Sequence, residues 1–170
     1  MNGSVMTAQG AFKIGDKAVY PAHGVGEVTD IQKKMIGGKE RSFYILKIIE
    51  NGMKIMVPVE TASSTGLRGI INKKEAKDVV DILKADEVAV TTQPWNRRYR
   101  EYMEMLKSGS PSQVAKVLRD LYRLKKEKDL SFGERRLLDT ARTLLITELA
   151  LATKSSEQDL EKEIRKIFGE

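Results

Sequence analysis

The side chains best suited to chemistry lie in the stretch QPWNRRYREYMEML, residues 93–106, and that chemistry is non-covalent. The stretch holds Trp95, the single tryptophan of the chain. Three arginines follow closely, at Arg97, Arg98 and Arg100. An apolar ring can wedge between stacked bases while flanking cations bind phosphates. The composition of this stretch therefore fits a surface that touches a polyanion.

Trp95 has a second interpretation, as the anchor of a helix in a buried core. It falls on roughly one helical stripe with Tyr99, Tyr102 and Leu106, and apolar positions with this period usually face a core. Its place at the start of the helix, beside Pro94, would let the ring project instead. The pattern leaves both interpretations open.

Residues that catalyse covalent chemistry or hold metals are scarce. The chain has one histidine, His23, and no cysteine. Histidine triads, paired imidazole ligands, cysteine nucleophiles, thiolate metal sites and disulfides are therefore excluded. The Asp and Glu residues form no recognisable acid and base pair within an apolar pocket signature. We predict a protein that is not an enzyme and needs no cofactor or metal.

The composition also limits the cellular compartments in which the protein is expected. No stretch reaches 18 apolar residues, and the start of the chain lacks the charged and apolar regions of a signal peptide. Residues 1–11 are small and polar, and we expect a flexible leader there. The absence of cysteine suits a reducing compartment, so a cytoplasmic protein with no membrane partner is expected. The formal net charge of +6 favours a polyanionic partner.

The N-terminal part of the chain has the pattern of strands and turns. Short β-branched and aromatic runs alternate with glycine, and Gly37-Gly38 and Asn51-Gly52 supply the positive φ angles that tight hairpins need. A sheet this narrow either closes on itself, as in SH3-like and Tudor-like barrels, or offers an edge to a partner. The meander is predicted to have strands over residues 25–36, 41–49 and 53–59.

From residue 72 onward the pattern is helical, with caps marking the helix starts. Asn72 with Glu75, and Ser131 with Glu134, have the spacing of capping boxes. The run Ser110-Pro111-Ser112-Gln113 combines an N-cap hydroxyl, a proline at the first helical position and the Gln of a capping box. Helices are expected over residues 72–85 and 94–107, from residue 110, from residue 131, and over residues 156–168, with a polar linker leading to Pro94.

These elements predict an α+β fold in two domains. A small Tudor-like or SH3-like β-barrel is expected over residues 12–71, and a compact all-α helical domain over residues 72–170. Residues 95–137 carry twelve Lys and Arg against six Asp and Glu, a net +6 that equals the charge of the whole chain. A cationic patch suited to phosphates is one interpretation, and a solvated helix face is the alternative. Besides the arginines after Trp95, the basic residues involved are Lys125, Lys126, Lys128, Arg135 and Arg136.

Five segments of the sequence resemble one known family. They are GDKAVYPAHGVGEV, NGMKIMVPVE, WNRRYREYMEMLKSG, AKVLRDLYRLKKEKDLSFGERRLLDTAR and LLITELALA. In their residues and spacing they resemble the CarD/CdnL family of bacterial transcription regulators, over about residues 12–168. The tryptophan and arginine motif and the LSFGER segment are specific to this family, whereas other small barrels share the opening segment GDKAVYP.

The resemblance implies a Tudor-like N-terminal domain that binds the β subunit of RNA polymerase. The contact carries over to Met56 and Pro58 of the strand MKIMVP, with Lys34 where relatives can place a base. Some relatives have arginine in place of Met56, and a core position is the alternative for this side chain. A β-edge paired with a polymerase strand would bind through main-chain hydrogen bonds.

For the helical domain, the resemblance implies contact with promoter DNA at the upstream edge of the melted bubble. The DNA-facing tryptophan of the family falls on Trp95, and its basic companions fall on Arg97, Arg98, Arg100 and Arg135. The expected function is that of a monomeric regulator that stabilises the open complex without reading sequence, with Trp95 as a wedge. Through the polymerase it would be associated with the nucleoid. Two alternatives are a free-standing DNA-architectural protein and an adaptor that binds only proteins and buries Trp95.

Overall fold

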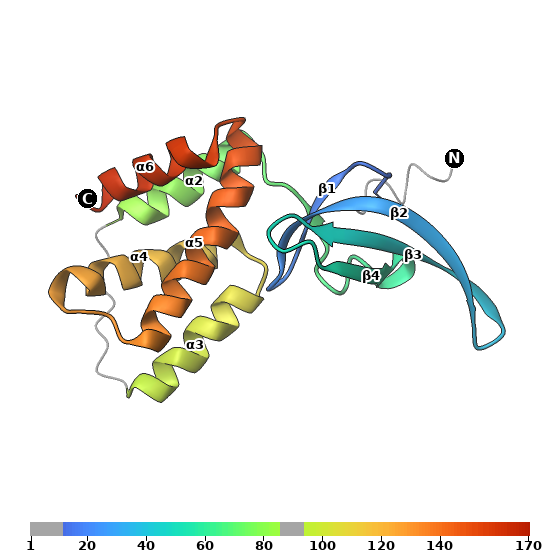
Figure 1. Ribbon diagram of the computed structural model, residues 1–170, viewed down its shortest axis with the longest axis horizontal. Helices are drawn as coiled ribbons and strands as arrows, with labels where there is room; N and C mark the ends of the chain where they lie inside the picture. The colour runs from blue at the N-terminus through green and yellow to red at the C-terminus, as the bar shows by residue number, and fades with distance from the viewer. Residues whose placement is uncertain (1–11, 86–93) are drawn as a thin grey trace. The chain divides into compact units, whose positions relative to one another are not determined.

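The computed structural model describes residues 12–85 and 94–170. The chain divides into two compact units, one up to Ile70 and one from Ile71 onward (Figure 1). The first unit consists of strands and the second of helices, which confirms the predicted α+β class. The predicted leader and residues 86–93 of the predicted linker lie outside the described residues.

The N-terminal unit is an antiparallel sheet with the strand order β4-β3-β2-β1-β5. The strands β2, β3 and β4 form the predicted meander, with ends within two residues of the expected ones. Gly37, Gly38 and Gly52 have positive φ angles, as the predicted hairpins require. The elements are β1 Lys17–Tyr20, β2 Gly24–Ile36, β3 Lys39–Ile48, β4 Lys54–Pro58, the short helix η1 Val59–Thr61 and β5 Arg68–Gly69.

The sheet is open, so the predicted closed barrel is wrong. β4 and β5 form the two edges, and no pairing joins them among the described strands. β5 is two residues long and pairs only with Ala18 and Val19 of β1. A barrel needs a continuous ladder around its circumference, and a strand this short cannot continue one. The other expectation, a sheet that offers an edge, is the one that the topology fits.

A register shift between Val28 and Asp30 divides β2 into two parts. Beyond the Gln32 and Phe43 pair, where β4 ends, β2 and β3 continue as a two-stranded arm with mostly exposed side chains, such as Met35, and Figure 1 shows the arm extending past β4. The rest of the sheet buries one apolar core. Its residues are Ala18, Val28, Tyr44, Leu46, Ile48, Val57, Ala62 and Leu67.

The described part of the C-terminal unit contains α2 Lys73–Lys84, α3 Trp95–Lys107, α4 Pro111–Glu127, α5 Phe132–Thr153 and α6 Glu157–Ile167. Both bonds of the capping box are present at the starts of α2 and α5, as predicted. At the start of α4 only half of the predicted box forms, because the Ser110 hydroxyl accepts from the Gln113 amide without a return bond from the Gln113 side chain. No described helix is long and apolar enough to cross a membrane.

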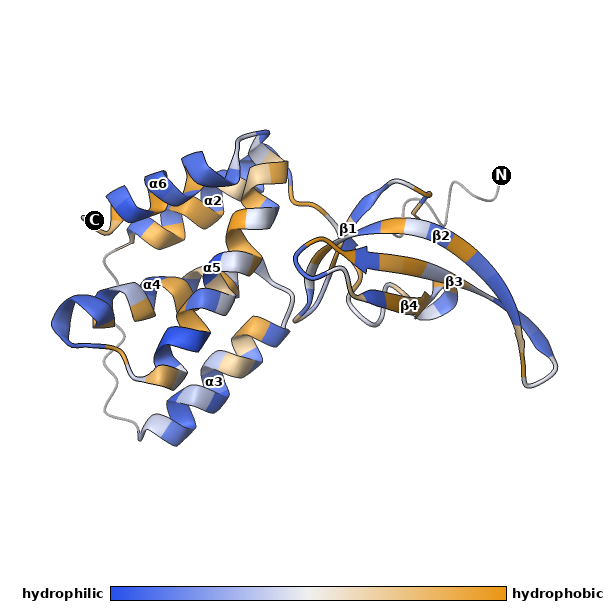
Figure 2. Ribbon diagram, in the orientation of Figure 1, coloured by the Kyte–Doolittle hydropathy of each residue, from blue (hydrophilic) through white to orange (hydrophobic). Residues whose placement is uncertain are grey.

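The helical core forms around α4, which packs against α2, α3 and α5. Figure 2 shows that each helix carries both hydrophobic and hydrophilic stretches, as expected for helices with one buried face. The buried face of α4 includes Val114, Val117, Leu118 and Leu121, and that of α5 includes Leu137, Leu138, Ala141, Leu145 and Leu149.

Two arginines of α4 hold the end of α2. Arg119 is buried, and its Nη1 donates to the Ile82 carbonyl at 3.4 Å. Arg123 donates to the carbonyl of Ala85, the residue that follows α2. The last carbonyls of a helix have no partner within it, so these guanidinium groups supply donors from another helix.

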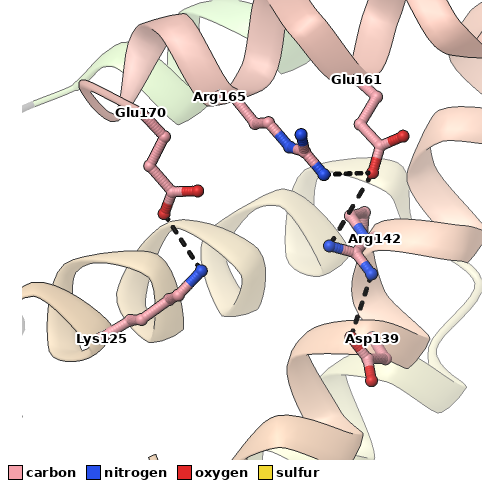
Figure 3. A network of polar contacts seen from close by, with 6 residues as sticks. All are labelled: Lys125, Asp139, Arg142, Glu161, Arg165 and Glu170. Carbon is pink, nitrogen blue, oxygen red and sulfur yellow. Dashed lines mark hydrogen bonds and ion pairs between the residues drawn. The ribbon is translucent and has the colours of Figure 1, made fainter. Parts of the chain in front are cut away.

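Ion pairs at the surface join α5 to α6 (Figure 3). Arg142 of α5 lies 3.1 Å from Asp139 and 3.9 Å from Glu161 of α6. Arg165 shares the Glu161 carboxylate at 3.4 Å. Exposed pairs of this kind contribute about 0 to 1 kcal/mol each, so the buried apolar faces dominate the stability of the helical unit.

Candidate nucleic-acid interface

The first turn of α3 is a region of positive potential. Pro94 precedes the helix and forms no side-chain cap, and the first turn has no acidic residue. A helix N-terminus carries a partial positive charge, which acidic side chains usually offset. Here Arg97, Arg98 and Arg100 add positive charge instead. The start of α3 therefore suits an anionic ligand.

Trp95 is partly buried, so it is neither sealed inside the core nor fully exposed. One side of its ring packs against the helical core, and the ring centroid lies 5.7 Å from that of the exposed Tyr99. The start of α5 also reaches the indole, because a Cβ atom at Gly133 would lie 3.5 Å from the Trp95 Cζ2. The ring is thus held by contacts from α3, α5 and the core, and part of it remains accessible.

Two of the three other residues of the predicted helical stripe face the core. Tyr102 and Leu106 are buried, whereas Tyr99 is not. Burial raises the pKa of Tyr102 to about 12, helped by the charge of Asp120 and opposed by Arg98. The hydroxyl of Tyr102 donates to the Asp120 Oδ2 of α4 at 3.5 Å. The buried side of the second half of α3 is therefore anchored to α4.

The predicted arginines differ in their surroundings. The side chain of Arg97 is 67% exposed and lies 3.8 Å from Glu101, a loose pair on the helix surface. Arg100 is exposed. Arg98 is partly buried, and its guanidinium carbon lies 5.3 Å from the centroid of the Trp95 ring. Two of these three cations can thus reach a ligand without any rearrangement.

The start of α5 adds an aromatic side chain that the sequence patterns did not single out. Phe132 is 75% exposed at the first position of α5, and the Arg136 guanidinium carbon lies 5.8 Å from its ring centroid. Arg135 is exposed and donates from Nε to the Leu130 carbonyl at 3.2 Å. An apolar residue outside the apolar stripe of its helix is the signal that could have found Phe132. Because Gly133 approaches Trp95, the start of α5, which carries the exposed Phe132, lies beside the start of α3.

Two of the three lysines of the predicted patch have acidic partners. Lys128 lies 3.1 Å from Glu134, which is only 2% exposed, and Lys125 lies 3.2 Å from Glu170. Burial alone would raise the pKa of Glu134, but hydrogen bonds from Ser131 and Lys128 outweigh it and lower that pKa below the usual value. These two lysines are therefore partly neutralised, and the arginines around Trp95 and Phe132, with the exposed Lys126, carry the available charge.

The residues predicted to bind the polymerase lie on the sheet. Met56 is 44% exposed on the edge strand β4, which excludes the core alternative for its side chain. Pro58 ends β4 and is partly buried. Lys34 is exposed on the arm, directly opposite Arg41 of β3. Two like charges side by side destabilise a strand pair, so this position favours an acidic partner.

Within the described residues, no cluster of His, Asp and Glu could hold a metal ion. The arrangement offers stacking, wedging and charge contacts, and these are chemistries of binding.

Comparisons with known proteins match both units. The family model described as CarD, C-terminal domain, matches residues 78–165, and the model described as CarD-like/TRCF RID domain matches residues 12–71. The Bacillus subtilis (strain 168) protein YdeB, whose name describes it as a transcription factor, is 32% identical over 158 residues, 93% of this chain and 99% of that protein. A solved structure described as "CdnLNt from Myxoccoccus xanthus" is 54% identical, covers 37% of this chain and 89% of its own, and has a TM-score of 0.32. These descriptions point to a transcription factor and name no enzyme. The chain belongs to the CarD/CdnL family.

Proposed function

We propose that the protein is a transcription regulator that binds the β subunit of RNA polymerase through its sheet and stabilises the promoter open complex through its helical unit. The observation that carries the proposal is the partly open Trp95 at an uncapped, cationic helix start, in a chain that belongs to the CarD/CdnL family. We further expect a monomer in the cytoplasm that meets the nucleoid through the polymerase.

The edge strand β4 would make the polymerase contact. β4 pairs with β3 on one side only among the described strands, so its outer backbone groups can pair with a strand of the partner. Met56 supplies exposed apolar surface on this strand, Pro58 bounds it, and Lys34 supplies a cation on the arm. Main-chain bonds would give affinity and these side chains would give specificity.

The helical unit would hold DNA by its backbone. Arg97, Arg100 and Arg135 are exposed and can neutralise phosphates on either side of the Trp95 ring. Contacts to phosphates position a protein without reading bases. Weak sequence preference and strong salt dependence follow from this arrangement. Arg98 has a different environment, because it is partly buried.

Trp95 would act where the two strands separate. A base pair at the edge of a bubble lacks one stacking partner, so an indole can take that place at lower cost than in intact duplex. This geometry exists in the open complex and not in the closed one, so binding shifts the population toward the open complex. A difference of about 1.4 kcal/mol in affinity for the two states changes their ratio about tenfold.

The alternatives predict different results. The protein-only adaptor requires Trp95 to be buried, and its partial exposure disfavours that role. A free-standing DNA-architectural protein would bind DNA without capturing the polymerase. These two differ from the proposal in one measurable property, the dependence of the open-complex effect on β4.

The test uses the full chain with Met56→Glu, which adds a negative charge to the proposed β4 contact. Capture of the polymerase β subunit should weaken, and the open-complex lifetime should shorten in proportion. Ile14→Glu is the matched control, because Ile14 is an exposed apolar residue ahead of β1, and β2 and β3 separate β1 from β4 in the sheet. Equal loss of capture in both variants, or full capture by Met56→Glu, contradicts the proposed β4 contact.

A further inference from the structure

Arg98 is the arginine after Trp95 that does not behave as a surface cation. Its side chain is partly buried, and its Nε has no exposed surface and no hydrogen-bond partner among the described residues. Arg97 and Arg100, on the same turn of α3, are exposed. The Nε–H of Arg98 is covered and cannot meet a phosphate unless the side chain moves, which sets Arg98 apart from its exposed neighbours.

The guanidinium of Arg98 lies against the ring of Trp95. The distance from its central carbon to the ring centroid is 5.3 Å, within the range of a cation–π contact, and the two residues are three positions apart on α3. Tyr99 packs on the same indole with an interplanar angle of 62°. Two neighbours on one turn therefore hold the indole, and one of them is charged.

Arg98 also contacts a buried residue of the helical core. Tyr102 lies one turn further along α3, is buried, and donates to Asp120 of α4. The Arg98 guanidinium interacts with the Tyr102 hydroxyl, where it counteracts part of the rise in the pKa of the phenol. Arg98 thus connects the open indole to a phenol that is fixed in the core.

We infer that Arg98 is a positioning residue, which holds the Trp95 ring in the orientation for DNA contact and does not bind a phosphate itself. A planar guanidinium can stack on an aromatic face in a way that an ammonium cannot reproduce. Loss of one exposed cation–π contact lowers the population of the held ring orientation about two- to fivefold. The effect on DNA rests on the proposed function, whereas the effect on the ring does not.

The first experiment measures the free protein. Trp95 is the only tryptophan, so intrinsic fluorescence reports this ring alone. Arg98→Gln should increase quenching by acrylamide and shift the emission, because the indole loses its cover. Arg100→Gln, the matched control at an exposed arginine, should leave both unchanged. Unchanged quenching and emission in Arg98→Gln would overturn the inference whatever the protein does with DNA.

The second experiment measures open-complex lifetime and the salt dependence of DNA binding. Arg98→Gln should shorten the lifetime about two- to fivefold while leaving the salt slope unaltered. Arg100→Gln should reduce the slope by about 0.9. In a Trp95→Leu background, Arg98→Gln should have no additional effect on lifetime, since it acts through the ring. A slope reduced as in Arg100→Gln would identify Arg98 as a phosphate contact.

Arg98→Lys is a control for misfolding of the Arg98→Gln variant. It keeps the charge and loses the planar stack, so it should shorten the lifetime like Arg98→Gln at an unchanged melting temperature. A lifetime fully restored by lysine would overturn the inference. If Trp95→Leu itself leaves the lifetime unchanged, the proposed function fails, and the quenching of free Arg98→Gln still decides the role of Arg98.

Discussion

Replacing Arg97, Arg100 and Arg135 together with glutamine should make DNA binding much less sensitive to salt. All three side chains are exposed, and each can neutralise one phosphate. The slope of log Kobs against log salt falls by about 0.9 for each phosphate released, so the triple variant should have a slope smaller by about 2.7. Between about 50 and about 200 mM salt, the wild-type protein should then lose about 40-fold more affinity than the variant.

Fluorescence anisotropy of a labelled forked duplex, titrated at four or more salt concentrations, measures this slope. The control is a triple variant with the same change of net charge, Lys73→Gln, Lys74→Gln and Lys77→Gln. These lysines are exposed on α2, which Figure 1 shows on the other side of the helical unit from α3. The control should retain the wild-type slope within about 0.5, because only contacts with the DNA release counterions.

Equal slopes in the wild-type protein and the arginine variant would refute the phosphate contacts. A slope lowered as much in the lysine control would show that net charge, and not this surface, determines affinity. In either case the cationic start of α3 would be a solvated helix face.

Three further predictions concern single residues. Trp95→Ala should lower the free energy of unfolding by about 1 to 2 kcal/mol, below the roughly 3 to 5 kcal/mol of a fully buried tryptophan, as measured by urea denaturation, and should shorten open-complex lifetime. Phe132→Ser should leave the melting temperature nearly unchanged because the ring is exposed, and should also shorten the lifetime; an unaltered lifetime would exclude Phe132 from the interface. Glu134→Gln should lower the free energy of unfolding by about 1 kcal/mol at pH 7. The pKa of Glu134 is lowered in the folded protein, so its stabilisation is fully present above about pH 4.5 and is lost as the pH falls through the lowered pKa. The difference in the free energy of unfolding between the two proteins should therefore shrink as the pH falls below about 4.5, and a difference that stays constant there would contradict the charge effect.

Local signals predicted the elements well. The capping boxes at Asn72 and Ser131 form because a cap and its partner are three residues apart, and the hairpin glycines adopt the required φ angles for reasons confined to the turn. The openness of the sheet was not predictable in this way. β5 is two residues long and has no alternating pattern, so whether the ladder closes depends on tertiary geometry.

The candidate site was likewise predictable from local sequence only in part. The motif after Trp95 identified the start of α3, but the helical stripe could not decide how much of the ring is covered, because that depends on Gly133 of a later helix. Spacing alone gave Arg98 the same role as Arg97 and Arg100, whereas its covered Nε and its contacts with Trp95 and Tyr102 exist only in the folded chain. Phe132 lies outside the apolar stripe of its helix, and its exposure in the folded chain shows that it does not belong to the core.

The hydrogen bonds from α4 to the end of α2 determine how the helical unit opens. Since Arg119 and Arg123 donate to carbonyls at the end of α2, the last turn of α2 cannot unwind without breaking bonds that belong to another helix. Isolated helix ends usually fray first and exchange their amide hydrogens quickly. Here the amides of that turn should exchange with deuterium as slowly as those of mid-α4, so the two helices form one cooperative opening unit.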